Sequence, residues 1–246
     1  MKTNLSSPQP GFEAAQSQPT RAALTYLKSI YQCSNGSGFV TTSLLADYLK
    51  VAPASVTAMS QKLAAATPAL VLYRKHHGMH LTAEGEGLAL RVIRRHRLLE
   101  AFLVKALGYS WDEVHEEAEL LEGSVSARLE GRLSIYTGHP AFDPHGAPIP
   151  DASLSIQQPP LIPLSQLKLK QSGCVRRVMS DDAGLLRYLT ELGIQIGSQV
   201  ELLAVIPFDQ TFQVRLDNGV ELRTLGTLLT SVILVEPIPE ILGDSH

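Results

Sequence analysis

This sequence of 246 residues has only two cysteines, a single tryptophan and no long apolar run. Cys33 and Cys174 lie far apart, so we expect no structural disulfide and a reduced compartment, the cytoplasm. No apolar run approaches the roughly 18 residues of a membrane span, and the polar N-terminal segment lacks a secretory signal pattern. Because 44% of the residues are hydrophobic, we expect instead two or three packed domains.

Positive charge is scarce in the chain as a whole, but it is unevenly distributed. The net charge is −3, which by itself does not favour a nucleic-acid partner. Residues 1–97 contain 11 Lys and Arg against 4 Asp and Glu, a formal +7, whereas residues 98–246 contain 10 against 20, a formal −10. A basic N-terminal part followed by an acidic remainder indicates a domain that binds the phosphates of nucleic acid. Chance asymmetry of the surface charge is the alternative.

The basic half has a pattern typical of a winged helix-turn-helix. After a first helix, two short helices over 41–49 and 53–65 are separated by a Pro-containing break. Two strands, 70–74 and 79–82, flank residues 75–78 and predict a hairpin wing. A small helical domain with an incidental hairpin is the alternative.

The second short helix is the one expected to read DNA, and its outward side chains are mostly small or hydroxylated. Such side chains suit close approach to phosphates and to the major groove. No arginine on this face offers a bidentate contact to guanine, so we expect specificity to rest on thymine methyl groups and DNA shape. The candidate DNA-contacting residues, with the wing tip included, are Ala54, Ser55, Thr57, Ala58, Ser60, Gln61, Lys62, Arg74 and Lys75.

The next two helices carry histidine and glutamate at helical spacing. His96 precedes Glu100 by one turn, and His115 shares a face with Glu119 and Glu122 on the following helix. If these faces meet, they offer imidazole and carboxylate ligands to a divalent transition metal. A solvated helix surface with i, i+4 pairs is the alternative.

The segments around these helices are predicted from capping and turn residues. Residues 110–113, Ser-Trp-Asp-Glu, predict a capping box for the helix of His115, and a further helix should extend through Arg132. The apolar stripe of this region suits dimerisation, because helix-turn-helix dimers read two half-sites. Residues 136–163, rich in Pro and Gly, predict turns and a linker outside the core, with His145 as a turn residue rather than a ligand.

The C-terminal region alternates short strands with turns. The predicted strands are 173–178, 199–205, 211–216 and 220–223, and one helix covers 183–192. About 75 residues with this pattern favour a small β-barrel of SH3 type. The sequence lacks the nucleophile motif of hydrolases and a phosphate-cradling loop, so we do not expect an enzyme.

Taken in order, these segments resemble the diphtheria-toxin-repressor family of iron- or manganese-dependent transcriptional regulators. The resemblance is carried by VAPASVTAMSQKL, LTAEG, RRHRLLEAFL, VHEEAELLEG and DPHGAPIP, and by LKQSGCVRRV and GSQVELL near the C-terminus. It covers nearly everything after the first 18 residues. It implies a homodimer that binds operator DNA when loaded with Fe²⁺ or Mn²⁺.

The resemblance also implies two metal sites in each subunit. The ancillary site would use His96, Glu100 and His115. The resemblance also implies carboxylate or amide ligands from the SH3-like domain, and Asp181 and Asp182 are the nearest candidates here.

The primary site would use Glu119 and Glu122, but this chain departs from the family pattern there. Gly123 occupies the position of a histidine ligand, and Thr25 occupies the position of the ligand from the first helix, with Lys28 in the turn after it. We therefore expect this site to be weak, rebuilt with other ligands, or replaced by an ion pair between Lys28 and Glu119 or Glu122.

We predict an α+β protein that represses metal-homeostasis genes in response to Fe²⁺ or Mn²⁺. It should bind operator DNA as a homodimer and have no membrane partner. The same fold without metal control is one alternative, and a metal-handling or scaffold protein acting through its SH3-like domain is another. The predicted segments are a flexible tail (1–18), a winged helix-turn-helix (19–90), a helical metal-binding and dimerisation domain (91–152), a Pro-rich linker (153–163) and an SH3-like, FeoA-like domain (164–238).

Overall fold

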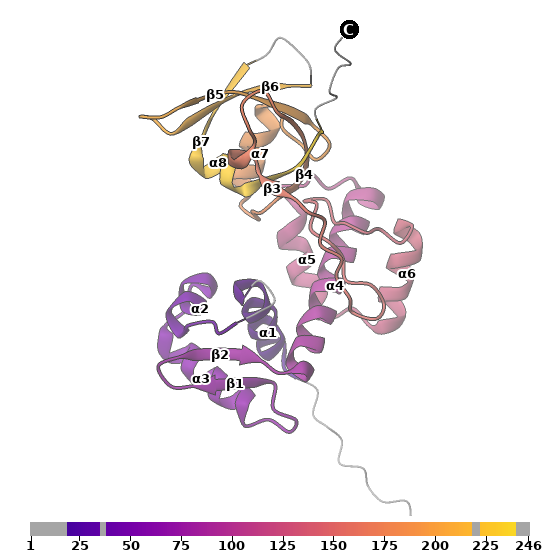
Figure 1. Cartoon of the computed structure of the whole chain (residues 1–246). Coiled ribbons are helices and arrows are strands. Elements are labelled where there is room, and N and C mark those ends of the chain that lie inside the picture. Colours follow the sequence, from indigo (N-terminus) through magenta and orange to yellow (C-terminus); the bar gives the residue numbers. More distant parts are fainter. Residues whose placement is uncertain (1–18, 35–37, 218–221, 240–246) are drawn as a thin grey trace, which may run out of the picture. The chain divides into compact units, whose positions relative to one another are not determined.

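The computed structural model describes residues 19–34, 38–217 and 222–239, which form two compact units, 1–85 and 86–246 (Figure 1). The predicted tail, 1–18, lies outside the described residues. None of the helices in these ranges is long and apolar enough to cross a membrane.

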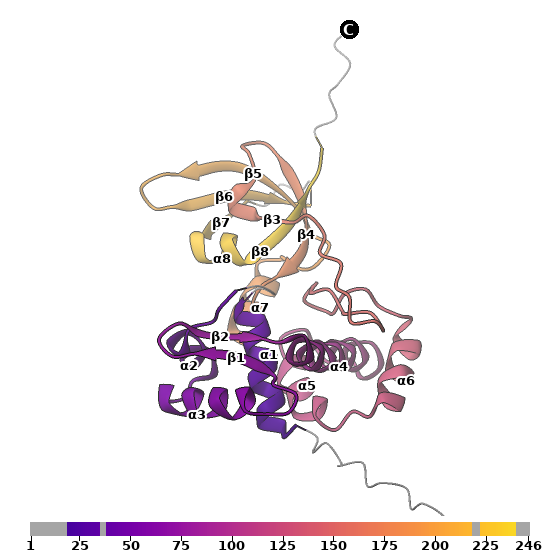
Figure 2. The same ribbon diagram turned by 60° about the horizontal axis from the view of Figure 1, so that its bottom comes forward.

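The first unit is the predicted winged helix-turn-helix. Its elements are α1 (Arg21–Ser34), α2 (Thr42–Leu49), α3 (Pro53–Ala64), β1 (Val71–Arg74) and β2 (Gly78–Leu81). The two strands pair antiparallel, and Figure 2 shows the hairpin beside α1 and α3. The core side chains are apolar residues at helical and strand spacing, among them Leu27, Ile30, Leu45, Val56, Leu63 and Met79.

Local sequence signals explain where the elements of the first unit begin and turn. The Thr41 side chain accepts a hydrogen bond from the Leu44 amide and caps α2, and Pro53 occupies the first turn of α3. Gly78 begins β2 with φ +102°, and a Cβ there would lie 2.1 Å from the Val40 carbonyl oxygen. Only glycine fits, because Val40 pairs with Met79 and brings its backbone against the wing.

The second unit begins with three helices: α4 (Ala83–Leu107), α5 (Val114–Glu122) and α6 (Ala127–Thr137). They share one apolar cluster that includes Leu98, Leu103, Ala118 and Leu133 (Figure 1). Because α4 carries apolar residues along one stripe, α5 and α6 can both pack against it.

Two helix boundaries differ from the prediction. Helix α6 extends to Thr137 rather than ending near Arg132, because Ser126 caps its start and Gly138 in the left-handed region ends it. The predicted capping box forms only in part: the Ser110 amide donates to the Glu113 carboxylate at 3.4 Å, but the Ser110 side chain does not cap α5, which begins at Val114 without a side-chain cap. The Glu113 carboxylate instead bonds the Ser110 hydroxyl at 2.8 Å within a turn.

The loop over 139–150 was predicted to lie outside the core, and that prediction is wrong. Residues 145–150 are all buried, and Ile149 belongs to the helical core. The guanidinium groups of Arg94 and Arg97 donate hydrogen bonds to the carbonyl groups of Pro150 and Pro148. Arginine donors therefore satisfy backbone groups that a proline-rich, non-helical segment cannot pair within itself.

The rest of the second unit is a six-stranded sheet in the order β3-β8-β4-β5-β6-β7, with antiparallel pairs throughout. Its strands and helices are β3 (Ile162–Pro163), β4 (Ser172–Val178), α7 (Ala183–Glu191), β5 (Gln199–Ile206), β6 (Thr211–Leu216), β7 (Leu222–Gly226), α8 (Thr227–Val232) and β8 (Ile233–Pro237), with a 3₁₀ turn at Leu164–Gln166. The sheet curls around an apolar core that includes Val175, Leu202, Val214 and Val235 (Figures 1 and 2). The predicted strands are confirmed for β4, β5 and β6, whereas β3, α8 and β8 were not foreseen.

Candidate metal centre

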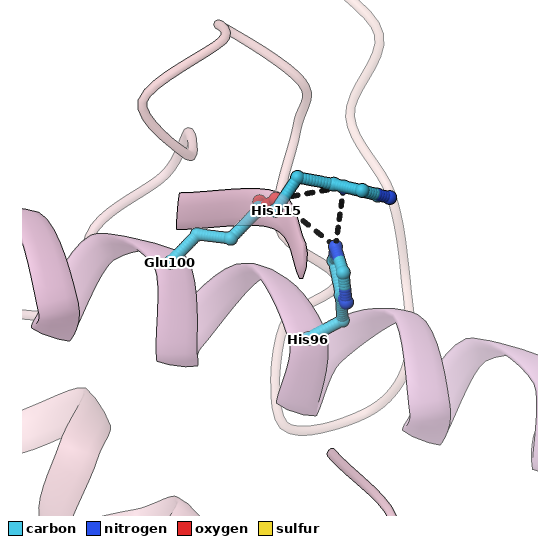
Figure 3. A group of neighbouring side chains, drawn as sticks. All are labelled: His96, Glu100 and His115. Carbon is cyan, nitrogen blue, oxygen red and sulfur yellow. Dashed lines mark hydrogen bonds and ion pairs between the residues drawn. The ribbon is translucent and has the colours of Figure 1, made fainter. Parts of the chain in front are cut away.

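Three side chains of the second unit converge on one point (Figure 3). The Oε1 atom of Glu100 lies 3.0 Å from His96 Nε2 and 3.3 Å from His115 Nδ1, and these two nitrogens lie 3.2 Å apart. Glu100 is 1% exposed and His96 is 5% exposed. A carboxylate and one imidazole are thus buried together, with the half-buried imidazole of His115 beside them, an arrangement that ordinary surface pairs do not show.

Local folding explains why these side chains meet. His96 and Glu100 are four residues apart on α4, so they stack on one face of the helix. His115 is the second residue of α5, and the buried Val114 and Ala118 pack that helix onto α4. The packing directs His115 toward the pair on α4, as Figure 3 shows.

A second group of possible ligands shares Glu100 with the first. Glu100, Asp143 and His145 place one ligand atom each within 4.8 Å of one another, and all three are buried. His145 Nδ1 lies 3.8 Å from Glu100 Oε1. Its other nitrogen, Nε2, lies 2.6 Å from the Trp111 carbonyl oxygen. Because a carbonyl oxygen only accepts hydrogen bonds, Nε2 carries a proton, and Nδ1 is the nitrogen that faces the carboxylate.

Asp143 and His145 were not among the predicted ligands. The Asp143 Oδ1 atom accepts hydrogen bonds from the His145 and Ala147 amides, and Oδ2 lies 3.4 Å from Arg97 Nε. The DPHG sequence predicts a turn, but it does not indicate that the turn is buried against α4. A histidine and an aspartate two residues apart in this turn were the only sequence signal for their proximity.

The SH3-like domain brings one of its two candidate aspartates to this cluster. Asp181 Oδ1 lies 3.8 Å from His115 Nδ1, and its side chain is about half exposed. The Asp182 side chain instead accepts a hydrogen bond from the Leu185 amide at 2.8 Å and caps α7. This gives Asp182 a structural role that its position before the helix explains.

Two further contacts join the SH3-like domain to the turn between α4 and α5. The Trp111 indole donates to the Thr190 hydroxyl at 2.9 Å, and Arg187 lies 3.3 Å from Asp112. The Val178 amide also donates to the His145 carbonyl at 2.9 Å. The position of Asp181 beside His115 therefore does not depend on a single interaction.

The two carboxylates of α5 that were predicted as primary-site ligands, Glu119 and Glu122, lie on the periphery of the cluster. Glu122 Oε2 is 2.7 Å from His96 Nδ1, and both side chains are buried. Glu119 Oε1 is 3.6 Å from His115 Nε2, and its side chain is half exposed. Each carboxylate thus lies against the ring nitrogen that faces away from Glu100.

The electrostatics follow from burial and from these contacts. Burial alone would raise the pKa of Glu100, but hydrogen bonds from His115 and His96 and the charge of the neighbouring histidines hold it well below its usual range. Burial would lower the pKa of His115, but Glu100, Glu119 and Asp181 raise it to about 10. Burial and the nearby charge of Glu100 raise the pKa of Asp143 to about 6.

This donor set fits a divalent transition metal. Imidazole nitrogens and carboxylate oxygens are ligands that iron and manganese accept. Glu100 stays negative without being exposed, and the nitrogen atoms around it can accept a cation once their protons leave.

The candidate DNA-contacting residues lie on the first unit, and most are exposed. Ala54, Ser55, Ala58, Gln61 and Lys62 of α3 are exposed, as are Arg74 and Lys75 of the wing, while Thr57 is half-buried. The Arg74 guanidinium lies 5.3 Å from the centroid of the Phe39 ring, which holds the wing arginine over an exposed aromatic side chain.

Ser60 was predicted to face outward, and that prediction is wrong. Ser60 is fully buried, and its hydroxyl donates to the Val56 carbonyl at 2.7 Å and lies 3.1 Å from Met79 Sδ. Position 60 lies one turn after Val56 and therefore shares the core face of α3. A small hydroxyl that bonds its own helix can occupy this face.

The departures from the expected primary site are visible separately in each unit. Thr25 donates its hydroxyl to the Arg21 carbonyl on α1. Gly123 follows α5 in a right-handed conformation that any residue adopts, so its backbone does not require glycine. The ion pair predicted for Lys28 with Glu119 or Glu122 would join the two units, and it stays a prediction.

Comparison with family models divides the chain into three matched regions. Residues 20–79 match the N-terminal DNA-binding domain of the iron-dependent repressors, and residues 82–151 match their metal-binding and dimerisation domain. Residues 162–237 match the FeoA domain. The cluster around Glu100 lies mainly within the second region.

Relatives of this chain include an iron-dependent repressor and a transcriptional regulator of the helix-turn-helix type. The iron-dependent repressor IdeR of Mycobacterium tuberculosis is 33% identical over 161 residues, which cover 65% of this chain and 61% of the relative. The transcriptional regulator MntR of Lysinibacillus sphaericus is 34% identical over 116 residues, 47% of this chain and 81% of the relative. The match thus spans less than two thirds of IdeR but most of MntR.

Solved structures share the fold over nearly the whole chain. A manganese-dependent transcriptional repressor in complex with manganese is 38% identical, with a TM-score of 0.80 over 88% of this chain and 100% of that one. ScaR with bound Zn²⁺ is 33% identical, with a TM-score of 0.74 over 89% of this chain and 100% of that one.

Proposed function

Because this chain belongs to the family of iron-dependent, or diphtheria-toxin, repressors, we propose that the cluster around Glu100 is the metal centre that controls its binding to DNA. The protein would be a repressor that responds to Fe²⁺ or Mn²⁺, because one relative is named an iron-dependent repressor and one solved structure a manganese-dependent transcriptional repressor. We infer His96, Glu100 and His115 as the central ligands. Asp143, His145 and Asp181 are the further donors within reach.

A single observation carries this proposal. One buried carboxylate oxygen, Glu100 Oε1, lies within 3.8 Å of a ring nitrogen from each of three histidines. Removing a carboxylate and imidazoles from water is costly unless the groups are paired or bind a metal. The residues come from α4, α5, the 143–145 turn and the SH3-like domain, so one site draws on four segments.

When bound, the ion supplies positive charge that replaces the protons between these imidazoles and carboxylates. Glu100 contributes the negative charge of the centre, since its low pKa keeps it ionised. His115 joins α5 to Glu100 of α4, and Asp181 joins the SH3-like domain to His115. A ligand changes DNA affinity only to the extent that it binds one arrangement of the chain better than another.

The DNA-binding half of the proposal rests on the first unit. Its α3 presents small, hydroxyl and amide side chains together with Lys62, and the wing adds Arg74 and Lys75. We infer that α3 enters the major groove and that the wing residues contact phosphate. We also infer a homodimer, whose contact surface would use the exposed apolar residues of α5 and α6, among them Leu120, Ile135 and Tyr136.

The experiment is fluorescence anisotropy on promoter DNA with Mn²⁺, with Fe²⁺ under anaerobic conditions, and with a chelator. We expect tight binding with metal and weak binding with chelator for the wild-type chain. The variant His115→Ala removes one of the proposed ligands. Glu116→Gln, which removes an exposed carboxylate from the same helix, is its matched control. Equal affinity with metal and with chelator would contradict the metal-controlled function while leaving DNA binding intact.

One observation favours a second candidate, a regulator of this fold that does not respond to metal. The cluster residues already bond one another, so the same contacts could simply hold the helices together. Calorimetric titration separates the two functions. A saturable Mn²⁺ site near micromolar concentration supports the metal-controlled repressor, and the lack of one supports the second candidate.

We also infer the domain division from the same regions: a tail over 1–18, a DNA-binding domain over 19–90, a helical domain over 91–152, a linker over 153–163 and an SH3-like domain over 164–238. The two compact units support a first boundary near residue 85, close to the inferred one. The location of the protein in the cytoplasm remains part of the proposal.

A further inference from the structure

We propose that Glu122 is a positioning residue that orients His96 from behind, instead of binding the metal itself. This inference rests on the proposed metal centre and differs from the ligand role predicted from the sequence. Glu122, which was predicted as a ligand of the primary site, would instead support a ligand of the ancillary site, His96.

The geometry at His96 carries the inference. The two ring nitrogens of an imidazole point in divergent directions. His96 Nε2 faces Glu100 Oε1 at 3.0 Å and His115 Nδ1 at 3.2 Å, whereas Nδ1 faces Glu122 Oε2 at 2.7 Å. An ion bound to Nε2 therefore lies on the opposite side of the ring from this oxygen of Glu122.

The short contact to Glu122 also fixes which nitrogen carries a proton. A carboxylate is an acceptor, so the 2.7 Å contact places a hydrogen on His96 Nδ1. Nε2 is then the nitrogen that can give up its hydrogen and bind an ion beside Glu100. Histidine ligands typically donate their other N–H to a carboxylate, which orients the ring and raises its basicity.

Burial distinguishes the contact between His96 and Glu122 from the contact between His115 and Glu119. The side chains of His96 and Glu122 are 7% and 9% exposed, so water competes weakly for either partner. Glu119, one turn earlier, contacts His115 at a longer 3.6 Å and is half exposed. The structure thus distinguishes two carboxylates that the sequence places on one face of α5.

The test compares Glu122→Ala and Glu122→Gln with the wild-type chain and with Glu116→Ala, a control on the exposed side of α5. Calorimetry with Mn²⁺ gives affinity and the number of ions bound. We expect Glu122→Ala to weaken binding about 10- to 100-fold with the number of ions unchanged. Glu122→Gln should lose less, because its amide oxygen still accepts the N–H, and Glu116→Ala should match wild type.

A second measurement reads the ring directly. In ¹⁵N-labelled, Zn²⁺-loaded protein, His96 should show a slowly exchanging Nδ1–H in wild type and in Glu122→Gln, and lose that signal in Glu122→Ala. Thermal unfolding by circular dichroism establishes that each variant is folded, and the Gln variant keeps the test open if the Ala variant is not.

Three results would overturn the inference. Loss of a whole equivalent of metal in both Glu122 variants would make Glu122 a ligand. Unchanged affinity and an unchanged Nδ1–H signal in Glu122→Ala would leave it without a role. If the wild-type chain bound no ion, the proposed function would fail together with this inference, whereas failure of the variants alone leaves the proposed function standing.

Discussion

The polar residues proposed to act in the two units differ in their exposure to solvent. Those of the first unit, such as Gln61, Lys62 and Lys75, are exposed to solvent. Those of the second, such as His96 and Glu100, are buried and bonded to one another. A DNA-contacting side chain remains hydrated until its partner arrives, whereas a buried metal ligand must find a substitute partner within the protein.

This difference shows how each kind of site is recognised. In the first unit the informative property is exposure on a helix and wing of the right architecture. In the second it is a group of ionisable side chains too buried to be ordinary surface pairs. Substitutions of the buried cluster residues should therefore alter both stability and metal binding. Substitutions of the exposed DNA-contacting residues should alter DNA binding without altering stability or metal binding.

The largest effect is expected for Glu100→Ala. This change removes the carboxylate that contacts His96, His115 and His145. Mn²⁺ affinity should fall by more than the roughly 10- to 100-fold caused by removing a residue that supports a ligand. The metal-free protein should lose about 3 kcal/mol of unfolding free energy, since a buried charged partner is left alone.

Calorimetry and chemical denaturation measure these two effects. Glu113→Ala, which removes an exposed carboxylate from the turn before α5, is the control. Wild-type metal affinity in Glu100→Ala would contradict the assignment of the centre. It would also remove the contrast between the two units.

The next effect is a dependence of metal affinity on pH. The pKa of His115 is raised to about 10 by Glu100, Glu119 and Asp181 despite the opposing effect of burial. Metal must displace this proton, so Mn²⁺ affinity should increase by up to about tenfold per unit as pH rises from 6.5 toward 10. Titrations at pH 6.5, 7.5 and 8.5 measure the slope.

The same shift has the opposite sign for the stability of the metal-free protein. A raised pKa stabilises the fold fully below about pH 6.5, the ordinary value for histidine, and this contribution is lost as pH rises toward 10. His115→Asn should remove both slopes. A metal affinity that does not change with pH would show that His115 is not protonated in the metal-free cluster.

A smaller, purely electrostatic effect is expected in the first unit. Arg74→Ala and Lys75→Ala each remove one exposed positive charge from the wing. Each should reduce the slope of log affinity for DNA against log salt concentration by about 0.9, with little dependence on sequence. Anisotropy at several salt concentrations measures the slope, and metal affinity should stay at the wild-type value.

The smallest effect is expected for Glu119→Gln. Its side chain is half exposed, and its contact with His115 is 3.6 Å long. An exposed ion pair contributes about 0–1 kcal/mol, so Mn²⁺ affinity should change by no more than about fivefold. A loss as large as that of Glu100→Ala would show that the exposed edge of the cluster belongs to its centre.

Much of this architecture could be predicted from the sequence, because local signals determine it. Thr41 and Pro53 marked the starts of two helices, and the spacing of His96, Glu100 and His115 on adjacent helices pointed to their meeting. Such features depend on neighbours in the chain and on helical periodicity.

What could not be predicted depends on contacts distant in the chain. His145 and Asp143 join the cluster only because the DPHG turn is buried against α4 and tied down by Arg97. The different environments of Glu119 and Glu122 depend on how α5 packs, which periodicity does not reveal.

The contact between Trp111 and His145 has a practical consequence. The two rings stack with centroids 6.2 Å apart, the indole bonds Thr190 of the SH3-like domain, and Trp111 is the only tryptophan in the chain. Its emission therefore comes from a single position beside the cluster. The fluorescence of the unlabelled protein can therefore be used to follow metal binding to the cluster and contact of the SH3-like domain with Trp111 in real time.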